Sequence, residues 1–291
     1  MKEQRRYNSG TALRAALEER LKRIALDEGV DLQRLRRRVA FDRFLARLFQ
    51  SGGHPDWVLK GGYAMELRFQ RARATRDLDF TVRAKPVGDD DAVLAILQEV
   101  GAADAGDWFT FRVSEATTDL DGAPYGGARY PVEAIMAGRT FVKFHLDVGI
   151  GDVIVDPVDT FQARDWLGFA GIPAASALII QSEQQFAEKI HAYTLPREGA
   201  PNSRVRDLVD LALLVQSGTM DSRRVAEALL RTFARRGTHE LPRVLTAPPE
   251  GWTAPFAVMA EECFLTISCA EAFDLVARYF QDAIHLNEGA G

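Results

Sequence analysis

Residues 57–82, WVLKGGYAMELRFQRARATRDLDFTV, constrain the fold of this chain more than any other stretch. A short apolar segment ends in two glycines, a helical pattern follows, and a second apolar segment alternates with carboxylates. The apolar spacing predicts a strand over Trp57–Lys60, a helix over 63–69 and a second strand over Asp77–Val82. The chain is therefore expected to build a strand–helix–strand unit with a basic, polar connection before its second strand.

Two glycines and two carboxylates occupy the chemically useful positions of this unit. Gly61 and Gly62 precede the predicted helix, while Asp77 and Asp79 share one face of the second strand because side chains alternate. A glycine turn lets the backbone come close to a ligand, and a helix start offers N–H groups to an anion. Paired carboxylates suit Mg²⁺, which usually reaches a protein together with substrate phosphates. Alone, each motif is usually a turn or solvated surface; their order predicts a site for a metal–nucleotide complex.

A third carboxylate is expected from a neighbouring strand. Residues 130–136 and 140–148 are strand-like and are joined by a short turn at Gly138, so a hairpin is predicted. In the second of these strands Asp147 lies on the face opposite to the apolar residues. His145 shares that face, but a histidine in such a place is more often packed or on the surface than a catalytic base.

The remaining sequence divides into a sheet-rich half and a helical half. Apolar periodicity predicts a strand over 109–113, an irregular segment over 157–173, and helices over 11–28, 31–49 and 87–101. Further helices are predicted over 204–215, 222–235, 270–286 and Ser182–Thr194, the last with Ser182 as its cap. We therefore predict two domains, 1–165 with the sheet and 166–291 with the later helices.

The charge distribution points to local rather than global binding of polyanions. A net charge of −5 does not indicate a nucleic-acid-binding protein, so any such contact must come from patches. One patch lies beside the predicted metal–nucleotide site and consists of Arg68, Arg71, Arg73 and Arg76. A second arginine run, at 34–38, is expected to be a solvated face, with an RNA-facing surface as the alternative.

The sequence favours a cytoplasmic protein. Cys263 and Cys269 are the only cysteines, and their apolar surroundings predict core thiols rather than a disulfide. No apolar run is long enough to span a membrane, and the N-terminal MKEQRRYNSG lacks the apolar core of a signal peptide.

The helical half carries charged residues at helical spacing. Lys189 precedes an apolar position of the helix Ser182–Thr194, and Asp207 and Asp210 share one face of the helix at 204–215. Spacing alone leaves two interpretations open. Lys189 is either a solvated lysine or a phosphate ligand, and the two aspartates either pair with Arg204 or Arg206, which contributes little, or belong to a site.

Four motifs in order resemble a known family. LKGGYAMELRF, TRDLDF, FAEKIHAYT and RVRDLVDLALL are similar to the AbiEii/AbiGii nucleotidyltransferase toxins, including the mycobacterial MenT group, over residues 58–215. The resemblance implies an α+β protein with a nucleotidyltransferase-fold mixed sheet, flanking helices and a helical C-terminal domain. It also implies a toxin with a separately encoded antitoxin, acting in phage defence or growth arrest.

The resemblance also assigns roles to individual residues. It implies nucleotide binding by Lys60, Gly61, Gly62, Lys189 and Asp207, and catalytic roles for Asp77, Asp79, Lys189 and Asp210. Lys189 would offer a compact charge to the β- and γ-phosphates, and Asp207 or Asp210 would orient that lysine or the ribose. The usual turn of this fold is Gly-Ser; here Gly-Gly is followed by Tyr63, so the phosphate grip depends more on backbone and lysine.

The implied chemistry is metal-dependent nucleotidyl transfer, of the EC 2.7.7 type, from an NTP. In-line displacement at the α-phosphorus expels pyrophosphate, and two Mg²⁺ or Mn²⁺ ions can hold the attacking and leaving oxygens. Asp77 and Asp79 would bind both ions. Asp147 would complete one of them and help to deprotonate the acceptor hydroxyl.

Thr75 is a candidate regulatory residue because it lies two residues before Asp77. In some relatives a Ser or Thr at this place is phosphorylated by the antitoxin, which silences the enzyme. A phosphate would add about two negative charges beside Asp77 and Asp79. The alternative is an ordinary loop threonine.

The expected acceptor is RNA, with the 3′ end of tRNA foremost, since some relatives block translation by modifying it. The arginine patch at 68–76 favours a polyanionic acceptor over a small molecule such as an aminoglycoside. Two rival hypotheses are nucleotidylation of a protein and a non-catalytic nucleotide-binding module. Product analysis separates the first, and the joint presence of Asp77, Asp79, Lys189 and Asp210 argues against the second.

Overall fold

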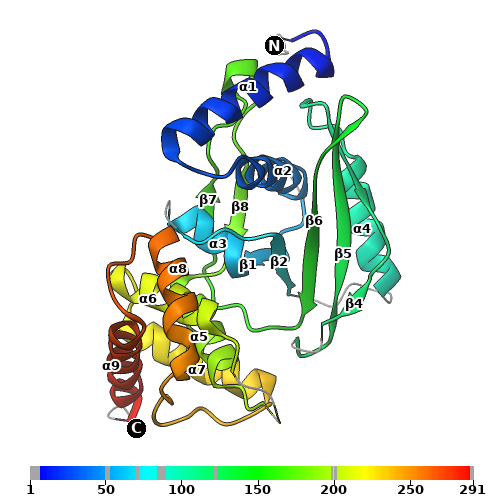
Figure 1. Cartoon of the computed structure of the whole chain (residues 1–291). Coiled ribbons are helices and arrows are strands. Elements are labelled where there is room, and N and C mark those ends of the chain that lie inside the picture. Colours follow the sequence, from blue (N-terminus) through cyan, green and yellow to red (C-terminus); the bar gives the residue numbers. More distant parts are fainter. Residues whose placement is uncertain are drawn as a thin grey trace. The chain divides into compact units, whose positions relative to one another are not determined.

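The computed structural model describes residues 7–49, 53–69, 72–83, 90–120, 123–197, 199 and 202–288 (Figure 1). The chain divides into two compact units. The sheet unit comprises Met1–Leu67, Ala74–Gly151 and Asp159–Ile179, and the helical unit comprises Arg68–Arg73, Asp152–Val158 and Ile180–Gly291. Two short segments, 68–73 and 152–158, therefore belong with helices that follow much later in the sequence.

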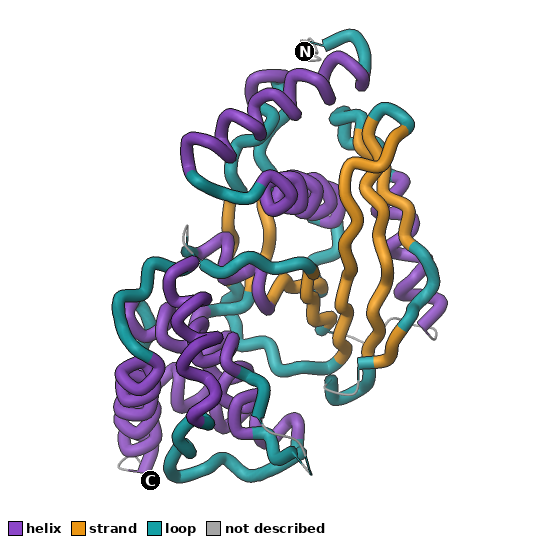
Figure 2. The backbone as a smooth tube through the Cα atoms, viewed as in Figure 1, coloured by secondary structure: helices purple, strands orange, loops and turns teal. Residues whose placement is uncertain are grey.

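The sheet unit is built on one mixed sheet (Figure 2). Among the described residues its eight strands include the path β3-β5-β6-β2-β1-β8-β7, with β4 paired to β5. Strands β2 and β6 run parallel, as do β1 and β8. The strands are β1 Trp57–Lys60, β2 Asp77–Val82, β3 Phe109–Val113, β4 Thr118–Asp119, β5 Gly127–Met136, β6 Arg139–Ile150, β7 Asp159–Gln162 and β8 Ser176–Ile179.

Helices flank the sheet, and helix α2 has the N-terminal cap that the sequence predicts. The helices that begin in this unit are α1 Gly10–Glu28, α2 Leu32–Leu48, α3 Gly61–Arg68 and α4 Asp90–Ala102. Asp31 caps α2, because its side chain accepts the backbone N–H of Arg34. A mixed sheet with flanking helices confirms the predicted α+β class.

The core of the sheet unit lies between α2 and one face of the sheet. The ring of Phe41 on α2 packs edge-on against Phe144 of β6, with ring centroids 5.0 Å apart, and against Tyr63 of α3 at 4.8 Å. Leu78 on β2 and Leu146 on β6 are fully buried. Because side chains alternate along a strand, the residues next to Leu78 on β2 and next to Leu146 on β6 emerge on the opposite face of the sheet.

The helical unit consists mainly of packed helices. Its helices are α5 Ser182–Thr194, α6 Val205–Gln216, α7 Ser222–Arg236, α8 Thr253–Glu262 and α9 Cys269–Glu288. Helix α5 packs against α6 and α7, and α9 packs against the same two helices. Cys263 and Cys269 are buried thiols, as predicted. Across the described part of the chain, none of the helices combines the length and the apolar character that a membrane crossing requires.

Two sequence predictions about local structure are wrong, and some short elements were not predicted. The segment 157–173, expected to be irregular, contains β7 and a short 3₁₀ helix at Gly168–Ala170. Strands β4 and β8 and helix α8 were not predicted, because strands of two and four residues and one short helix carry little periodic signal. Ser182 is not a cap: Gln181 takes that place without a side-chain hydrogen bond, and Ser182 is already helical.

The arginine run at the start of α2 is not simply a solvated face. Arg34 and Arg38 form ion pairs with the buried carboxylate of Glu66 on α3, at 3.1 and 3.7 Å. Arg36 pairs with Glu18 of α1 at 2.6 Å. Three of the four arginines in the run therefore join α2 to its two neighbouring helices.

Candidate active site

Three carboxylates lie together on one face of the sheet because β2 and β6 pair in parallel. In this register Asp77 lies opposite His145, and Asp79 lies opposite Asp147. All four side chains emerge opposite the face that carries Leu78. We call Asp77, Asp79 and Asp147 the carboxylate cluster.

The double glycine lets the start of α3 approach this cluster. Gly61 has a φ of +66°, and a Cβ at this position would lie 2.1 Å from Oδ2 of Asp79. A Cβ on Gly62 would lie 2.7 Å from Oγ1 of Thr75. The backbone N–H of Gly62 donates to Oδ2 of Asp79 at 3.4 Å. Glycine is required at Gly61 for conformation and at both positions for space.

A buried network fixes α3 from beneath. The hydroxyl of Tyr63 donates to Oδ1 of Asp42 at 2.5 Å, and Nε1 of Trp166 donates to Oδ2 at 2.6 Å. Burial raises the pKa of Asp42 to about 7. On the next turn Glu66 accepts the backbone N–H of Thr75 at 2.7 Å. The glycine turn is therefore held by partners distant in sequence, which the local pattern of residues did not predict.

The carboxylate cluster carries an excess of negative charge. Burial and the adjacent carboxylate of Asp147 raise the pKa of Asp79 to about 7. Lys60 lies opposite Asp79 on β1, and its charge acts in the other direction. Asp77 is more accessible than Asp147, with a side chain that is 28% exposed against 12%. Such a cluster attracts cations.

Arg129 on β5 already supplies one cation. Its Nε donates to Oδ1 of Asp147 at 2.7 Å, and its Nη2 donates to Oδ2 at 2.6 Å. The same Nη2 lies 3.5 Å from Oδ2 of Asp77. The hydrogen bond to Asp147 raises the pKa of Arg129 further above its usual range. The sequence analysis did not identify this residue.

His145, which sequence reasoning set aside, also contacts the cluster. Its Nδ1 lies 3.1 Å from Oδ1 of Asp77, and its side chain is 44% exposed. Its shared face with Asp147 was the available signal, but the partner of the histidine depends on which strand lies beside β6. A histidine beside a carboxylate can orient that carboxylate toward a ligand.

The carboxylate oxygens of the cluster suit a divalent metal ion, although the side chains that the structure describes do not form a complete ligand set. Asp77 and Asp79 offer the carboxylate oxygens that Mg²⁺ and Mn²⁺ prefer. Over the residues that the structure describes, no three His, Cys, Asp or Glu side chains are arranged to hold one ion. The guanidinium of Arg129 engages both oxygens of Asp147 and stands there as the local cation.

The predicted residues of the helical unit form a separate, buried ion cluster. Nζ of Lys189 lies 2.5 Å from Oδ2 of Asp210 and 3.3 Å from Oδ1 of Asp207. Nη2 of Arg73 lies 2.8 Å from Oδ2 of Asp210. Asp210 is fully buried, and Lys189 is 7% exposed.

Charge pairing decides the protonation of this cluster. Burial opposes ionisation, but the carboxylates of Asp210 and Asp207 raise the pKa of Lys189 above its usual value. Conversely, Lys189 and Arg73 hold the pKa of Asp210 below its usual value despite burial. Lys189 and Asp210 therefore form a charged pair that joins α5 to α6. Phosphate binding by Lys189, and the roles of Asp207 and Asp210 toward a nucleotide, stay predictions.

The arginines predicted to bind RNA differ in their surroundings. Arg68 donates to the carbonyl oxygen of Ile180, and Arg73 is paired with Asp210. Arg76 is exposed. Arg71 lies outside the described residues. RNA binding by this arginine patch stays a prediction, and Arg76 is the most accessible of its described residues.

Thr75 lies between the glycine turn and the carboxylate cluster. It is half-buried, and its Oγ1 donates to the backbone oxygen of Asp77 at 3.4 Å. This hydroxyl also faces the space that a Cβ on Gly62 would occupy. A modification of Thr75 would therefore act on the helix start and on the strand that carries Asp77.

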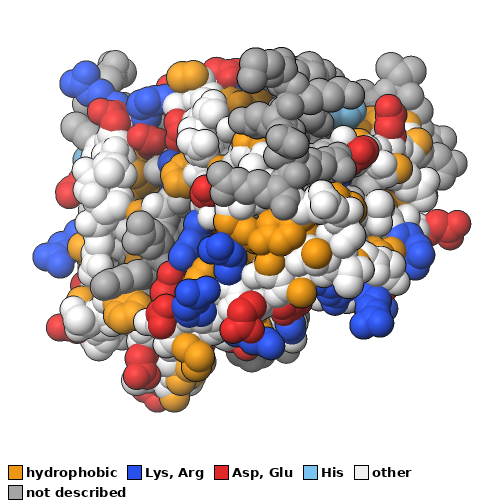
Figure 3. Space-filling view, turned by 90° about the horizontal axis from the view of Figure 1, so that it is seen from above, with side chains coloured by type: hydrophobic (Ala, Val, Ile, Leu, Met, Phe, Trp, Pro, Cys, Tyr) orange, Lys and Arg blue, Asp and Glu red, His pale blue; other side chains and the backbone are white. Residues whose placement is uncertain are grey.

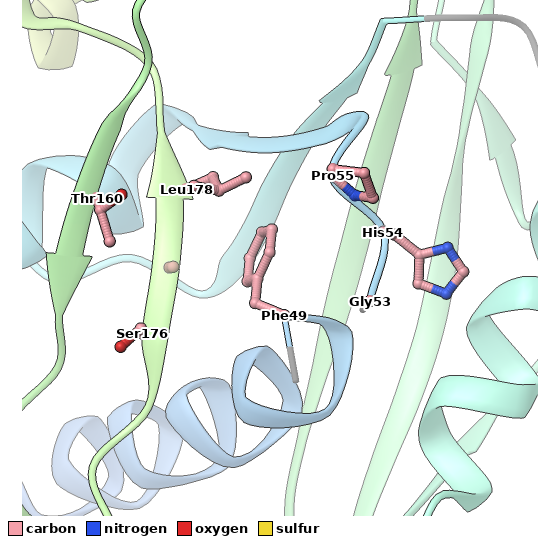
Figure 4. A pocket seen from close by; sticks show the side chains of 8 residues that line it. Phe49, Gly53, His54, Pro55, Thr160, Ser176 and Leu178 are labelled. Carbon is pink, nitrogen blue, oxygen red and sulfur yellow. The ribbon is translucent and has the colours of Figure 1, made fainter. Parts of the chain in front are cut away.

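A cavity of about 380 Å³ in the sheet unit is separate from the carboxylate cluster (Figure 4). Its walls include Phe49, Pro55 and Leu178, and the first and last of these point toward one another. No residue of the carboxylate cluster lines it. We therefore do not assign the nucleotide to this cavity.

Known proteins resemble this chain in sequence and in fold. The family described as "Nucleotidyl transferase AbiEii toxin, Type IV TA system" matches residues 43–276. The structure is similar to MenT4, a nucleotidyltransferase toxin of Mycobacterium tuberculosis, with a TM-score of 0.58 and 22% identity over 92% of this chain and 98% of that one. It is also similar to JHP933 of Helicobacter pylori, with a TM-score of 0.51 and 15% identity over 89% and 95%.

These similarities identify the fold and the family of the chain. No curated protein matches the sequence. The mixed sheet with flanking helices has the fold of MenT4, a nucleotidyltransferase toxin, and is shared with JHP933. The family match covers β1, α3, β2 and β6, and thus both the glycine turn and the carboxylate cluster. The chain belongs to the AbiEii nucleotidyltransferase toxin family of type IV toxin–antitoxin systems.

Proposed function

We propose that this chain is a metal-dependent nucleotidyltransferase that moves a nucleoside monophosphate from an NTP to an RNA acceptor, foremost the 3′ end of tRNA. The observation that carries the proposal is the carboxylate cluster beside the glycine turn, within an AbiEii family member. The turn brings backbone N–H groups of a helix start next to carboxylates that attract cations. That pairing suits a triphosphate bound with a metal ion.

The chemistry follows from these positions. The acceptor hydroxyl attacks the α-phosphorus, the new P–O bond forms, and the bond to pyrophosphate breaks. Asp77 and Asp79 would hold Mg²⁺ or Mn²⁺, which when bound neutralises charge on the triphosphate. Asp147 would receive the proton of the acceptor hydroxyl. The N–H groups at the start of α3 would bind phosphate oxygens.

The choice of an RNA acceptor rests on local charge. Among the described residues on the face seen in Figure 3, Lys and Arg side chains lie close to Asp and Glu side chains. Exposed arginines such as Arg76, Arg204 and Arg206 would contact an RNA backbone locally. Such phosphate contacts position a substrate without reading its sequence. Recognition by shape and backbone is therefore proposed.

A separately encoded antitoxin is part of the proposal, because the family belongs to toxin–antitoxin systems. Growth arrest by a block in translation would follow from modification of tRNA. Control through Thr75 is the regulatory element of this proposal, given its position beside Gly62 and Asp77.

One screen tests the proposal. Purified protein is incubated with each labelled NTP in turn, Mg²⁺ and either total RNA, purified tRNA or total protein, and the labelled product is identified. We expect label in tRNA, with less label as salt concentration rises because phosphate contacts are screened. Label in protein or small molecules with tRNA untouched at low salt would contradict the proposed acceptor.

A further inference from the structure

Arg129 is fixed across from the third carboxylate by the strand register. Strands β5 and β6 are antiparallel neighbours, and Arg129 lies directly opposite Asp147. Both oxygens of Asp147 accept hydrogen bonds from the guanidinium, at 2.7 and 2.6 Å. Bidentate arginine–carboxylate pairs of this length are among the strongest polar contacts in proteins. The pair is therefore a built feature of the sheet.

The same guanidinium reaches a second member of the carboxylate cluster. Its Nη2 lies 3.5 Å from Oδ2 of Asp77, so one positive charge lies between Asp147 and Asp77. An arginine stays charged at any physiological pH. While Arg129 is present, Asp147 therefore has no open bidentate edge to offer a second ion. Each of its oxygens keeps a lone pair that can accept the proton of the acceptor hydroxyl.

We propose that Arg129 is the fixed cation of this active site and replaces one of two metal ions. The inference rests on the proposed function. The site takes a single divalent ion, on Asp77 and Asp79, and Asp147 is not a ligand of that ion. The two-ion arrangement expected from the sequence is thereby reduced to one ion and one arginine.

The remaining donors of Arg129 indicate what it contributes. The guanidinium has five N–H donors, and its contacts to the cluster use Nε and Nη2. Among the described residues Nη1 makes no hydrogen bond, and the side chain is 35% exposed. Nη1 thus presents two N–H groups beside the carboxylates, where a phosphate oxygen of the NTP would accept them. Arg129 binds both the third carboxylate and the substrate.

Titration of the purified protein with Mn²⁺ alone measures the number of ions and their affinity. The wild type is expected to bind one ion. In Arg129→Met the released Asp147 is expected to add a second ion or to tighten the first by about tenfold, since a unit charge near a divalent ion contributes about that much in water-like surroundings.

Arg112→Met is the matched control. Arg112 on β3 forms an ion pair with Glu133 at 2.8 Å on the same sheet, and its side chain is 69% exposed. This variant loses the same charge and also breaks an arginine–carboxylate ion pair, but away from the carboxylate cluster, so it should bind Mn²⁺ as the wild type does. An equal gain in both variants would reveal only net charge and would overturn the inference.

A charge-balanced double variant keeps the test decisive if Arg129→Met does not fold. Arg129→Gln with Asp147→Asn removes the pair without changing net charge, and the inference expects an affinity within about threefold of the wild type. A larger loss would mean that Asp147 is a ligand. Two ions bound by the wild type would overturn this inference alone. No ion bound by the wild type would overturn the proposed metal dependence as well.

Discussion

Replacement of Gly61 by alanine tests whether the close approach of the glycine turn to Asp79 matters for transfer. The φ of +66° costs an L side chain about 1–2 kcal/mol, and the added Cβ would lie 2.1 Å from Oδ2 of Asp79. Non-bonded atoms do not come so close, so Asp79 or the start of α3 must move. We expect the unfolding free energy to fall by about 1–2 kcal/mol from the backbone alone, and transfer to fall about 100-fold from the misplaced carboxylate.

Gly171→Ala separates these two effects. Gly171 also has a positive φ, +75°, in the sheet unit, but a Cβ there meets no atom within 4 Å. Urea unfolding and initial rates of labelled transfer are measured for both variants. The control should lose about the same stability from its backbone and keep wild-type transfer. Equal transfer rates in the two variants would refute the reasoning about Asp79.

Three further predictions concern residues around the sites. Burial raises the pKa of Asp42 from 3.8 to about 7, so the folded chain binds this proton more tightly and the unfolding free energy falls as pH rises through that window. In Asp42→Asn, urea unfolding at several pH values should show a decrease in unfolding free energy that is smaller by up to about 4 kcal/mol. An unchanged pH dependence in this variant would contradict the assignment to Asp42. Lys189→Met leaves the buried carboxylate of Asp210 with Arg73 alone, so the unfolding free energy should fall by about 3–5 kcal/mol. If NTP affinity of the folded variant is unchanged, Lys189 is a structural residue and not a phosphate ligand. Thr75→Glu places a negative charge beside the start of α3 and should abolish labelled transfer, whereas Thr75→Val should keep it; an active Thr75→Glu protein would exclude control at this site.

The sequence predicts those parts of the fold that local patterns determine. Strands β1 and β2 and helix α5 have the predicted bounds, because alternation and helical spacing are strong within each segment. The pairing of β2 with β6 brings Asp147 opposite Asp79, as expected for a carboxylate from a neighbouring strand. Two glycines in sequence also suffice to predict a turn that only glycine permits at Gly61.

The contact of Arg129 with Asp147 could not be predicted from the sequence, because a β-bulge determines which residue of β6 lies opposite Arg129. Continuing the register of the turn, in which Met136 lies opposite Arg139, would place Arg129 opposite Leu146. The pairing instead shifts near Ala134, so that Arg129 lies opposite Asp147. A shift of one residue moves every following side chain to the other face. Local periodicity carries no signal for such a shift.

The buried polar networks could not be predicted from the sequence for a different reason. Asp42, Tyr63 and Trp166 meet from three distant segments, and each is ordinary in its own sequence context. Glu66 likewise takes partners from α2 and from the loop before β2. Which polar groups are buried together depends on tertiary packing, so sequence patterns locate the carboxylate cluster but not its supports.

Nucleotide transfer by variants of the carboxylate cluster shows whether these carboxylates form the active site. Wild type, Asp79→Asn and the exposed control Asp119→Asn are compared for labelling of purified tRNA with NTP and Mg²⁺, alongside urea unfolding. We expect Asp79→Asn to lose transfer while its stability is equal or higher, because one of two adjacent carboxylate charges is removed. The control should match the wild type. Near-normal transfer by Asp79→Asn would contradict the assignment of the active site.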